Sequence, residues 1–98
     1  MPPYPQMLAE DRRLTILRTL QQDDDLRVNE FVLKRALEQM GHDVNRELVR
    51  ADLAWLRAQL LITVREEGGE VWIATATEDG VKVATGRRHP GVAYPVAP

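Results

Sequence analysis

The stretch VNRELVRADLAWLRAQL, residues 44–60, decides the fold of this chain. Large apolar residues recur in it at i, i+4, i+7 and i+11, which is the spacing of one face of an α-helix. These residues are Val49, Leu53, Leu56 and Leu60. Asn45 precedes the periodic run and is a preferred N-cap residue. We therefore predict a helix over residues 46–60 that packs its apolar stripe against the rest of the domain.

A second helix is predicted over residues 30–40, immediately before this one. Asn29 can cap its start, and Gly41 stands where helices commonly end in a left-handed conformation. Its apolar positions at i, i+3, i+4 and i+7 are Leu33, Ala36, Leu37 and Met40. A short link joins the two predicted helices, so together they match the helix-turn-helix pattern.

The residues before this pair predict a first helix over residues 8–21. Its apolar stripe consists of Ala9, Leu14, Ile16, Leu17 and Leu20. Arg13 projects into the same stripe, where a charge is costly unless it is paired or reaches water. Either this long side chain extends past the edge of the core, or it forms a buried ion pair with an acid such as Glu10 or Asp52.

Alternating apolar residues predict a very short strand around residues 26–28 and a β-hairpin over residues 62–75. The glycine pair 68–69 supplies the positive φ that a tight hairpin turn requires. Thr77 can cap a last short helix over residues 78–86. The sequence therefore changes from helical to strand periodicity after the third helix, and returns to a helix at its end.

The length of 98 residues suits one small domain. We expect a flexible N-terminus over residues 1–7 and a folded domain over residues 8–86. An extended tail is expected over residues 87–98, because repeated prolines there exclude regular structure. No stretch approaches the roughly 20 apolar residues that span a bilayer, and from the composition of the first residues we expect no secretory signal. A cytoplasmic protein is expected.

The composition excludes several kinds of chemistry. The chain contains no cysteine, which removes disulfides, thiolate metal sites and a cysteine nucleophile. It also contains no serine, and its two histidines, His42 and His89, are far apart in predicted loops. The acidic run 23–25 lacks the second ligand set of a cation loop, and it is better explained as linker charge. We expect no enzymatic activity, no cofactor and no metal site.

The predicted order of elements resembles the winged helix-turn-helix fold over residues 8–86. VNRELVRADLAWLRAQLLITV resembles the third helix and first wing strand of bacterial winged-helix regulators. AEDRRLTILRTL ahead of LAWLRAQLLITV is similar to small ArsR-like regulators of Mu-like bacteriophages and prophages. The resemblance implies an α+β, mainly α fold with three helices, a small antiparallel sheet with a hairpin wing and a short C-terminal helix. It also implies a DNA-binding transcriptional regulator.

Two departures limit what this resemblance implies. ArsR-type metal sensors use cysteines or clustered histidines and acids, so metal sensing is not carried over to this chain. Many winged helices place glycine where the third helix gives way to the wing, whereas this chain has Gln59, Leu60 and Leu61. Either the connection from the third helix to the wing has a different shape, or Leu60 is strained in a left-handed conformation.

The predicted third helix can present a DNA-binding face. At about 100° per residue, its arginines gather on one flank, and Glu47 with three alanines, at 51, 54 and 58, lies on the outermost side. Arginine can bind phosphates or guanine, and small residues permit close approach. A second basic pair on the tail suits either a DNA-contacting arm or a solubilising tail. The candidate DNA-binding residues are Asn45, Arg46, Glu47, Arg50, Ala51, Arg57, Arg87 and Arg88.

Other features favour a protein partner. The net charge is −2, and the predicted wing tip places Glu66, Glu67 and Glu70 against a single Arg65, whereas a wing on phosphates should be basic. The alternative hypothesis is therefore an interaction module that docks a phage or host protein. A homodimer is expected if the chain binds double-stranded DNA, because two copies read two half-sites. The tryptophans are predicted to cover core edges or to serve in an interface.

Overall fold

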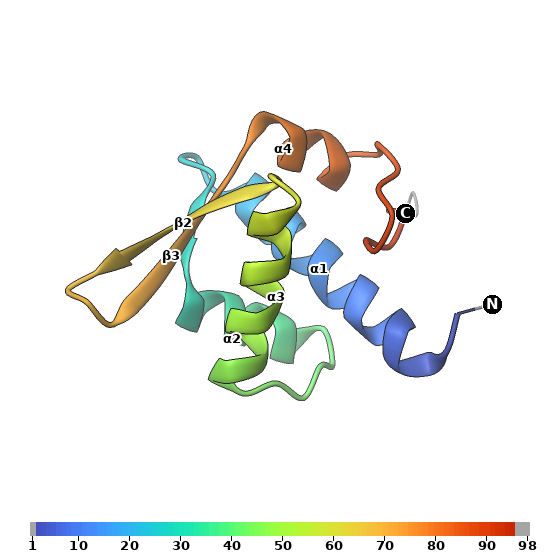
Figure 1. The fold of residues 1–98 in the computed structure, drawn as a ribbon, viewed down its shortest axis with the longest axis horizontal. Coiled ribbons are helices and arrows are strands. Elements are labelled where there is room, and N and C mark those ends of the chain that lie inside the picture. Colours follow the sequence, from blue (N-terminus) through green and yellow to red (C-terminus); the bar gives the residue numbers. More distant parts are fainter. Residues whose placement is uncertain (1, 96–98) are drawn as a thin grey trace.

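The computed structural model describes residues 2–95, and in this range it confirms the predicted mainly α, α+β fold class (Figure 1). The elements in chain order are α1 (Tyr4–Gln22), β1 (Arg27–Asn29), α2 (Glu30–Gln39), α3 (Arg46–Ala58), β2 (Ile62–Glu67), β3 (Val71–Ala76) and α4 (Glu78–Ala84). No helix in this part of the chain is long and apolar enough to cross a membrane.

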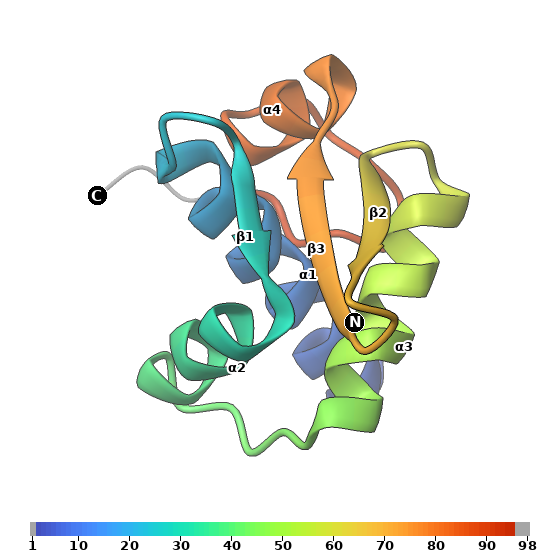
Figure 2. The ribbon, with the colours of Figure 1, turned by 90° about the vertical axis from the view of Figure 1, so that its left-hand side faces the viewer.

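The three strands form one antiparallel sheet in the order β1-β3-β2. The short strand β1 pairs with β3, with Val28 opposite Ala74, as Figure 2 shows beside the hairpin. The β2–β3 hairpin extends away from the helices and is called the wing below. Its turn contains Gly68 and Gly69, both at positive φ. The arrangement is winged-helix-like.

The core lies between α1, α2, α3 and the inner face of the sheet. Val49, Leu53 and Leu56 are fully buried, as the helical stripe predicts. The prediction for Leu60 was wrong, because α3 ends at Ala58 and Leu60 is 74% exposed. Leu60 adopts a left-handed conformation with φ of 62°, and this turn directs Leu61 into the core instead. The strain expected where glycine is missing is therefore present at this joint.

Both ends of the described range extend or contact the folded domain. Helix α1 begins at Tyr4 rather than at residue 8, because Pro5 lies in the first turn, where no backbone hydrogen bond is lost. Residues 87–95 contain no helix or strand, yet they pack on the domain: Val92 is buried and the Ala93 amide donates to the Glu10 carbonyl. Residue 1 and residues 96–98 of the predicted termini lie outside the described residues.

The arginine in the α1 stripe has a different partner from the predicted acids. The guanidinium of Arg13 lies 3.9 Å from the ring centroid of Trp55 and donates to the Gly91 carbonyl at 2.8 Å. The acid pair belongs instead to Arg12, whose Nε lies 2.7 Å from the Asp52 carboxylate. The buried-pair alternative for Arg13 was wrong because its side chain turns toward the C-terminal segment.

Candidate nucleic-acid interface

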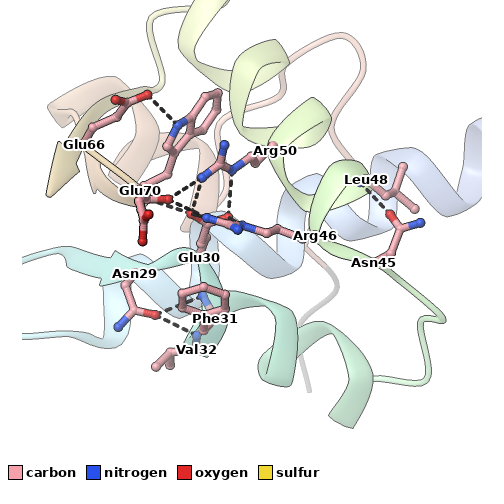
Figure 3. A network of polar contacts seen from close by, with 11 residues as sticks. Asn29, Glu30, Phe31, Val32, Asn45, Arg46, Leu48, Arg50, Glu66 and Glu70 are labelled. Atoms are coloured by element: carbon pink, nitrogen blue, oxygen red, sulfur yellow. Dashed lines mark hydrogen bonds and ion pairs between the residues drawn. The ribbon is translucent and has the colours of Figure 1, made fainter. Parts of the chain in front are cut away.

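The two helices of the helix-turn-helix begin at capping asparagines, as predicted. The Asn29 side chain accepts hydrogen bonds from the Phe31 and Val32 amides at the start of α2. The Asn45 side chain accepts from the Leu48 amide at the start of α3. Figure 3 shows both caps, with the Asn45 cap on the side of α3 that lies away from the wing. The side-chain oxygen of the candidate Asn45 is therefore occupied by the helix end.

A buried carboxylate joins α2, α3 and the wing at this junction. Glu30 is only 1% exposed and accepts from Arg46 Nε and Arg50 Nε, each at 2.9 Å (Figure 3). It also accepts from the backbone amide of Trp72 at 2.7 Å. The Nη2 groups of both arginines further donate to the backbone carbonyl of Glu70 in the wing turn. We call these five residues the Glu30 cluster.

The charge state of the Glu30 cluster follows from these contacts. The hydrogen bond from Arg50 is the main cause that lowers the pKa of Glu30 from 4.5 to about 2. Burial opposes this change, and the hydrogen bonds from Arg46 and from the Trp72 amide reinforce it. Glu30 is therefore ionised at neutral pH. Its bond to Arg50 also raises the pKa of that guanidinium.

Both clustered arginines keep one edge available. The side chains of Arg46 and Arg50 are 42% and 30% exposed, respectively. Their Nη1 groups make no hydrogen bond to any residue in the range 2–95. Each guanidinium is therefore fixed along one edge and has two N–H donors left for an external acceptor.

Aromatic rings support this arginine flank. The guanidinium of Arg50 lies 4.7 Å from the Trp72 ring centroid, and that of Arg57 lies 5.5 Å from it. Arg46 lies 5.2 Å from the ring of Phe31, which is 45% exposed. Such contacts hold arginines in place without hiding their N–H edges. The flank is therefore a strip of three arginines along α3, each beside an aromatic ring.

The outer side of α3 beside this strip is open. Glu47, Ala51 and Ala58 are exposed, and Ala54 is half-buried. A backbone or a base edge could approach the helix closely over these short side chains. The structure thus brings six of the eight predicted residues together on α3 and its cap.

The other two predicted residues lie elsewhere. Arg87 pairs with Asp79 of α4 at 2.9 Å, and Arg88 lies over the ring of Tyr94. The next residue, His89, is 3.1 Å from Gln59, which follows the C-terminal end of α3. Because α3 has 13 residues, its two ends are roughly 20 Å apart. The C-terminal basic pair therefore does not join Arg46 and Arg50.

The wing remains acidic in the folded domain. Arg65 is paired with Glu67 at 2.6 Å, and Glu66 accepts from the indole N–H of Trp72. Glu70 contributes its backbone carbonyl to the Glu30 cluster, and its side chain is exposed. Among residues 2–95, no three His, Asp or Glu side chains are grouped as metal ligands.

Sequence reasoning missed Glu30, Phe31 and the role of Trp72 at the site. An acid directly after an N-cap is common because it favours the positive end of the helix dipole. Nothing in this local pattern distinguishes a solvated glutamate from a buried one. The only signal was the presence of two arginines one turn apart on the next helix, which need a counter-charge if they are held together.

Comparisons with known proteins show that the chain is related to a phage protein. No family model matches the chain, and no solved structure matches it. An uncharacterized protein of Haemophilus influenzae is 30% identical over 82 residues, covering 84% of this chain and 79% of that protein. The uncharacterized protein gp26 of Escherichia phage Mu is 43% identical over 90 residues, covering 91% of this chain and 92% of gp26. The chain therefore belongs to the family of phage Mu gp26.

Proposed function

We propose that this protein binds double-stranded DNA as a winged-helix regulator of a phage or prophage, with α3 in the major groove. One observation carries the proposal. Arg46 and Arg50 are oriented by the buried Glu30 and keep free N–H edges beside an open alanine face. That face lies on the second helix of the helix-turn-helix, which is the helix that reads base edges in this motif.

Preorganisation explains why a buried acid would serve DNA binding. A free arginine loses conformational entropy when it binds, whereas these two are already held by hydrogen bonds and aromatic rings. Their remaining donors suit phosphate oxygens or the O6 and N7 atoms of guanine. Arg57 lies about two turns beyond Arg50 on the same flank of α3 and adds a third positive charge.

The same cluster limits non-specific affinity. Glu30 offsets one of the two positive charges of Arg46 and Arg50, and the wing beside them is acidic. Because phosphate neutralisation supplies most non-specific affinity, a single copy should bind random DNA weakly. Useful affinity then requires two copies on two half-sites, so we propose a homodimer as the DNA-binding form.

The test should leave the Glu30 cluster intact. Replacing Arg46 and Arg50 by alanine would strand the buried Glu30 and confuse unfolding with loss of DNA contact. Ala51→Glu and Arg57→Glu instead change exposed positions of α3 outside the cluster. Gln21→Glu, in the last turn of α1, adds a negative charge at an exposed site away from α3 and serves as the control.

The measurement is selection of fragments from the phage genome at low and moderate salt. We expect enrichment of particular fragments by the wild type and by Gln21→Glu. Ala51→Glu and Arg57→Glu should each weaken binding by about tenfold or more, because a carboxylate then faces the phosphates. Equal, salt-insensitive retention by all four proteins would contradict DNA binding through α3.

A second candidate function is docking of a phage or host protein without DNA. The observation that favours it is the wing, whose exposed acids at 66, 67 and 70 are unsuited to a phosphate backbone. Replacing Glu67 and Glu70 by lysine should then abolish co-purification of a defined partner from the native host. The same change should leave DNA binding equal or stronger if the first proposal is right.

A further inference from the structure

A groove between α1 and α2 lies apart from the candidate DNA surface. It has a volume of about 590 Å³, and no residue of α3 or of the wing lines it. Apolar side chains from both helices form its floor, and they are Leu14, Val32, Ala36 and Met40. Arg18 of α1 and Arg35 of α2 also line it, as does Asp11, whose carboxylate lies 2.7 Å from His42 Nε2. This surface is called the α1–α2 groove below.

The floor of the groove exposes large apolar groups. Val32 of α2 is 44% exposed, and Met40, the C-cap residue of α2, is 65% exposed, although the other face of this helix is buried. With Ala36 they fall at i, i+4 and i+8, which aligns them along one side of α2. An exposed apolar strip of this kind offers a contact surface for the apolar side chains of a partner.

The two arginines that line the groove, Arg18 and Arg35, differ from every other cation in residues 2–95. The chain has 13 lysines and arginines. Within the described range, each of the others makes an ion pair, a hydrogen bond to a backbone carbonyl or a contact with an aromatic ring. Arg18 and Arg35 make none of these contacts. Two positive charges without an internal partner therefore line the groove beside its apolar residues, and Asp11 is the one acid among the lining residues.

We propose that the α1–α2 groove binds an amphipathic, acidic α-helix of a partner protein. Apolar side chains spaced at i, i+3 or i+4 and i+7 would contact Val32, Ala36 and Met40, as in other helix-in-groove complexes. Aspartates or glutamates beside this stripe would pair with Arg18 and Arg35, whose planar guanidiniums suit bidentate carboxylate binding. A phosphate backbone would satisfy the arginines but would leave the apolar floor unused.

The proposal does not depend on DNA binding by α3. Because Arg18 and Arg35 make no internal contact, charge reversal at both positions should leave the domain folded, which circular dichroism and thermal melting check. Lys34→Glu is the matched control, since Lys34 lies on α2 next to Arg35 but does not line the groove. Val32→Asp tests the apolar floor separately from the charges.

The experiment uses a panel of labelled peptides of about 18 residues, long enough to be partly helical in water. Each peptide carries apolar residues at helical spacing in a different register, flanked by glutamates. Each also has a twin peptide in which lysines replace the glutamates. Binding to the full chain is followed by fluorescence anisotropy and by NMR shifts of the labelled protein. We expect saturable binding of at least one acidic peptide, with shifts centred on Val32, Ala36 and Met40.

The variants then decide the outcome. Arg18→Glu with Arg35→Glu, and Val32→Asp alone, should each weaken acidic peptide binding roughly tenfold or more, whereas Lys34→Glu should change it by less than about threefold. The proposal is overturned if no acidic peptide binds, if the lysine twins bind equally, or if the shifts fall on α3. A further contrary outcome is that no peptide binds but Arg18→Glu with Arg35→Glu abolishes DNA retention, or dissociates a homodimer seen by sedimentation. In that case the groove would serve DNA binding or dimerisation instead.

Discussion

Two buried carboxylates, Glu30 and Asp52, hold the two sides of the helix-turn-helix in different ways. Glu30 is 1% exposed and accepts hydrogen bonds from two arginines and one backbone amide, which belong to α3 and β3. Asp52 is 3% exposed and accepts from one guanidinium, that of Arg12 on α1. The first joins the helices to the wing, and the second joins two helices that already share a core.

This difference shows where polar groups determine geometry. Fully buried Leu53 and Leu56 of α3 already hold this helix in the core, so the Asp52 pair adds to an attachment that apolar packing provides. The wing strand β2 is largely exposed beyond Ile62 and Val64 and has little apolar surface to fix its position. The Glu30 cluster therefore sets how the wing and the arginine flank stand relative to each other.

The largest effect is expected for Glu30→Ala. This change leaves the guanidiniums of Arg46 and Arg50 next to each other without their counter-charge and leaves the Trp72 amide without its acceptor. We expect the free energy of unfolding to fall by about 3–5 kcal/mol in urea titrations. Glu47→Ala, at an exposed site in the first turn of α3, is the control and should change it by less than about 0.5 kcal/mol. A loss under 1 kcal/mol for Glu30→Ala would mean that the cluster does not hold the junction.

The second effect is a pH dependence of stability. The pKa of Glu30 is lowered to about 2 in the folded protein from 4.5. Its contribution is therefore fully present above pH 4.5 and is lost as the pH falls toward 2. A pKa difference of this size corresponds to roughly 3 kcal/mol. The stability difference between wild type and Glu30→Gln should shrink by an amount of this order between pH 6 and pH 2. A difference that stays constant with pH would be incompatible with the ionised cluster.

A smaller effect is expected for Asp52→Asn. Asparagine keeps the shape and can still accept one hydrogen bond from Arg12, whose side chain is 13% exposed and can reach water. We expect a loss of roughly 1–2 kcal/mol, read from thermal melting. The NMR signal of the Trp72 indole should not move, because the wing is held by Glu30 and not by Asp52. Movement of that signal would show that the two sides are coupled and would weaken the comparison.

The smallest effect concerns the joint between α3 and the wing. Leu60 has a φ of 62° and is 74% exposed, so its side chain contributes little packing while its backbone is strained. Leu60→Gly should raise the free energy of unfolding by about 0.5–1 kcal/mol, since glycine adopts this conformation without steric cost. Leu60→Val, which is β-branched, should lower it. If Leu60→Gly instead displaces the wing in NMR spectra, the joint shares the role given to Glu30.

Much of the architecture could be predicted because periodicity reports burial directly. Val49, Leu53 and Leu56 are buried as the helical spacing requires, and the capping asparagines at 29 and 45 begin α2 and α3. The short strand before α2 was also predicted, and it pairs with the hairpin. These features are local, since each depends on residues within about two turns of one another.

The candidate site could be predicted only in part. The arginine flank and the alanine face follow from the angular positions of residues on one helix. Its counter-charge could not be found, because Glu30 is 16 and 20 residues away from the two arginines it binds. For the same reason an acid partner was considered for Arg13 but not for its neighbour Arg12, which pairs with a residue 40 positions away.

By itself the sequence determined which segments are helical, which faces are apolar and where the two helices of the helix-turn-helix begin. Only the tertiary structure decided which charges pair with one another, namely that Arg46 and Arg50 are held by Glu30 while Arg18 and Arg35 line the α1–α2 groove without an internal partner. The reason is physical: helix and strand formation depend on neighbours along the chain, whereas ion pairing depends on distances that chain folding alone sets.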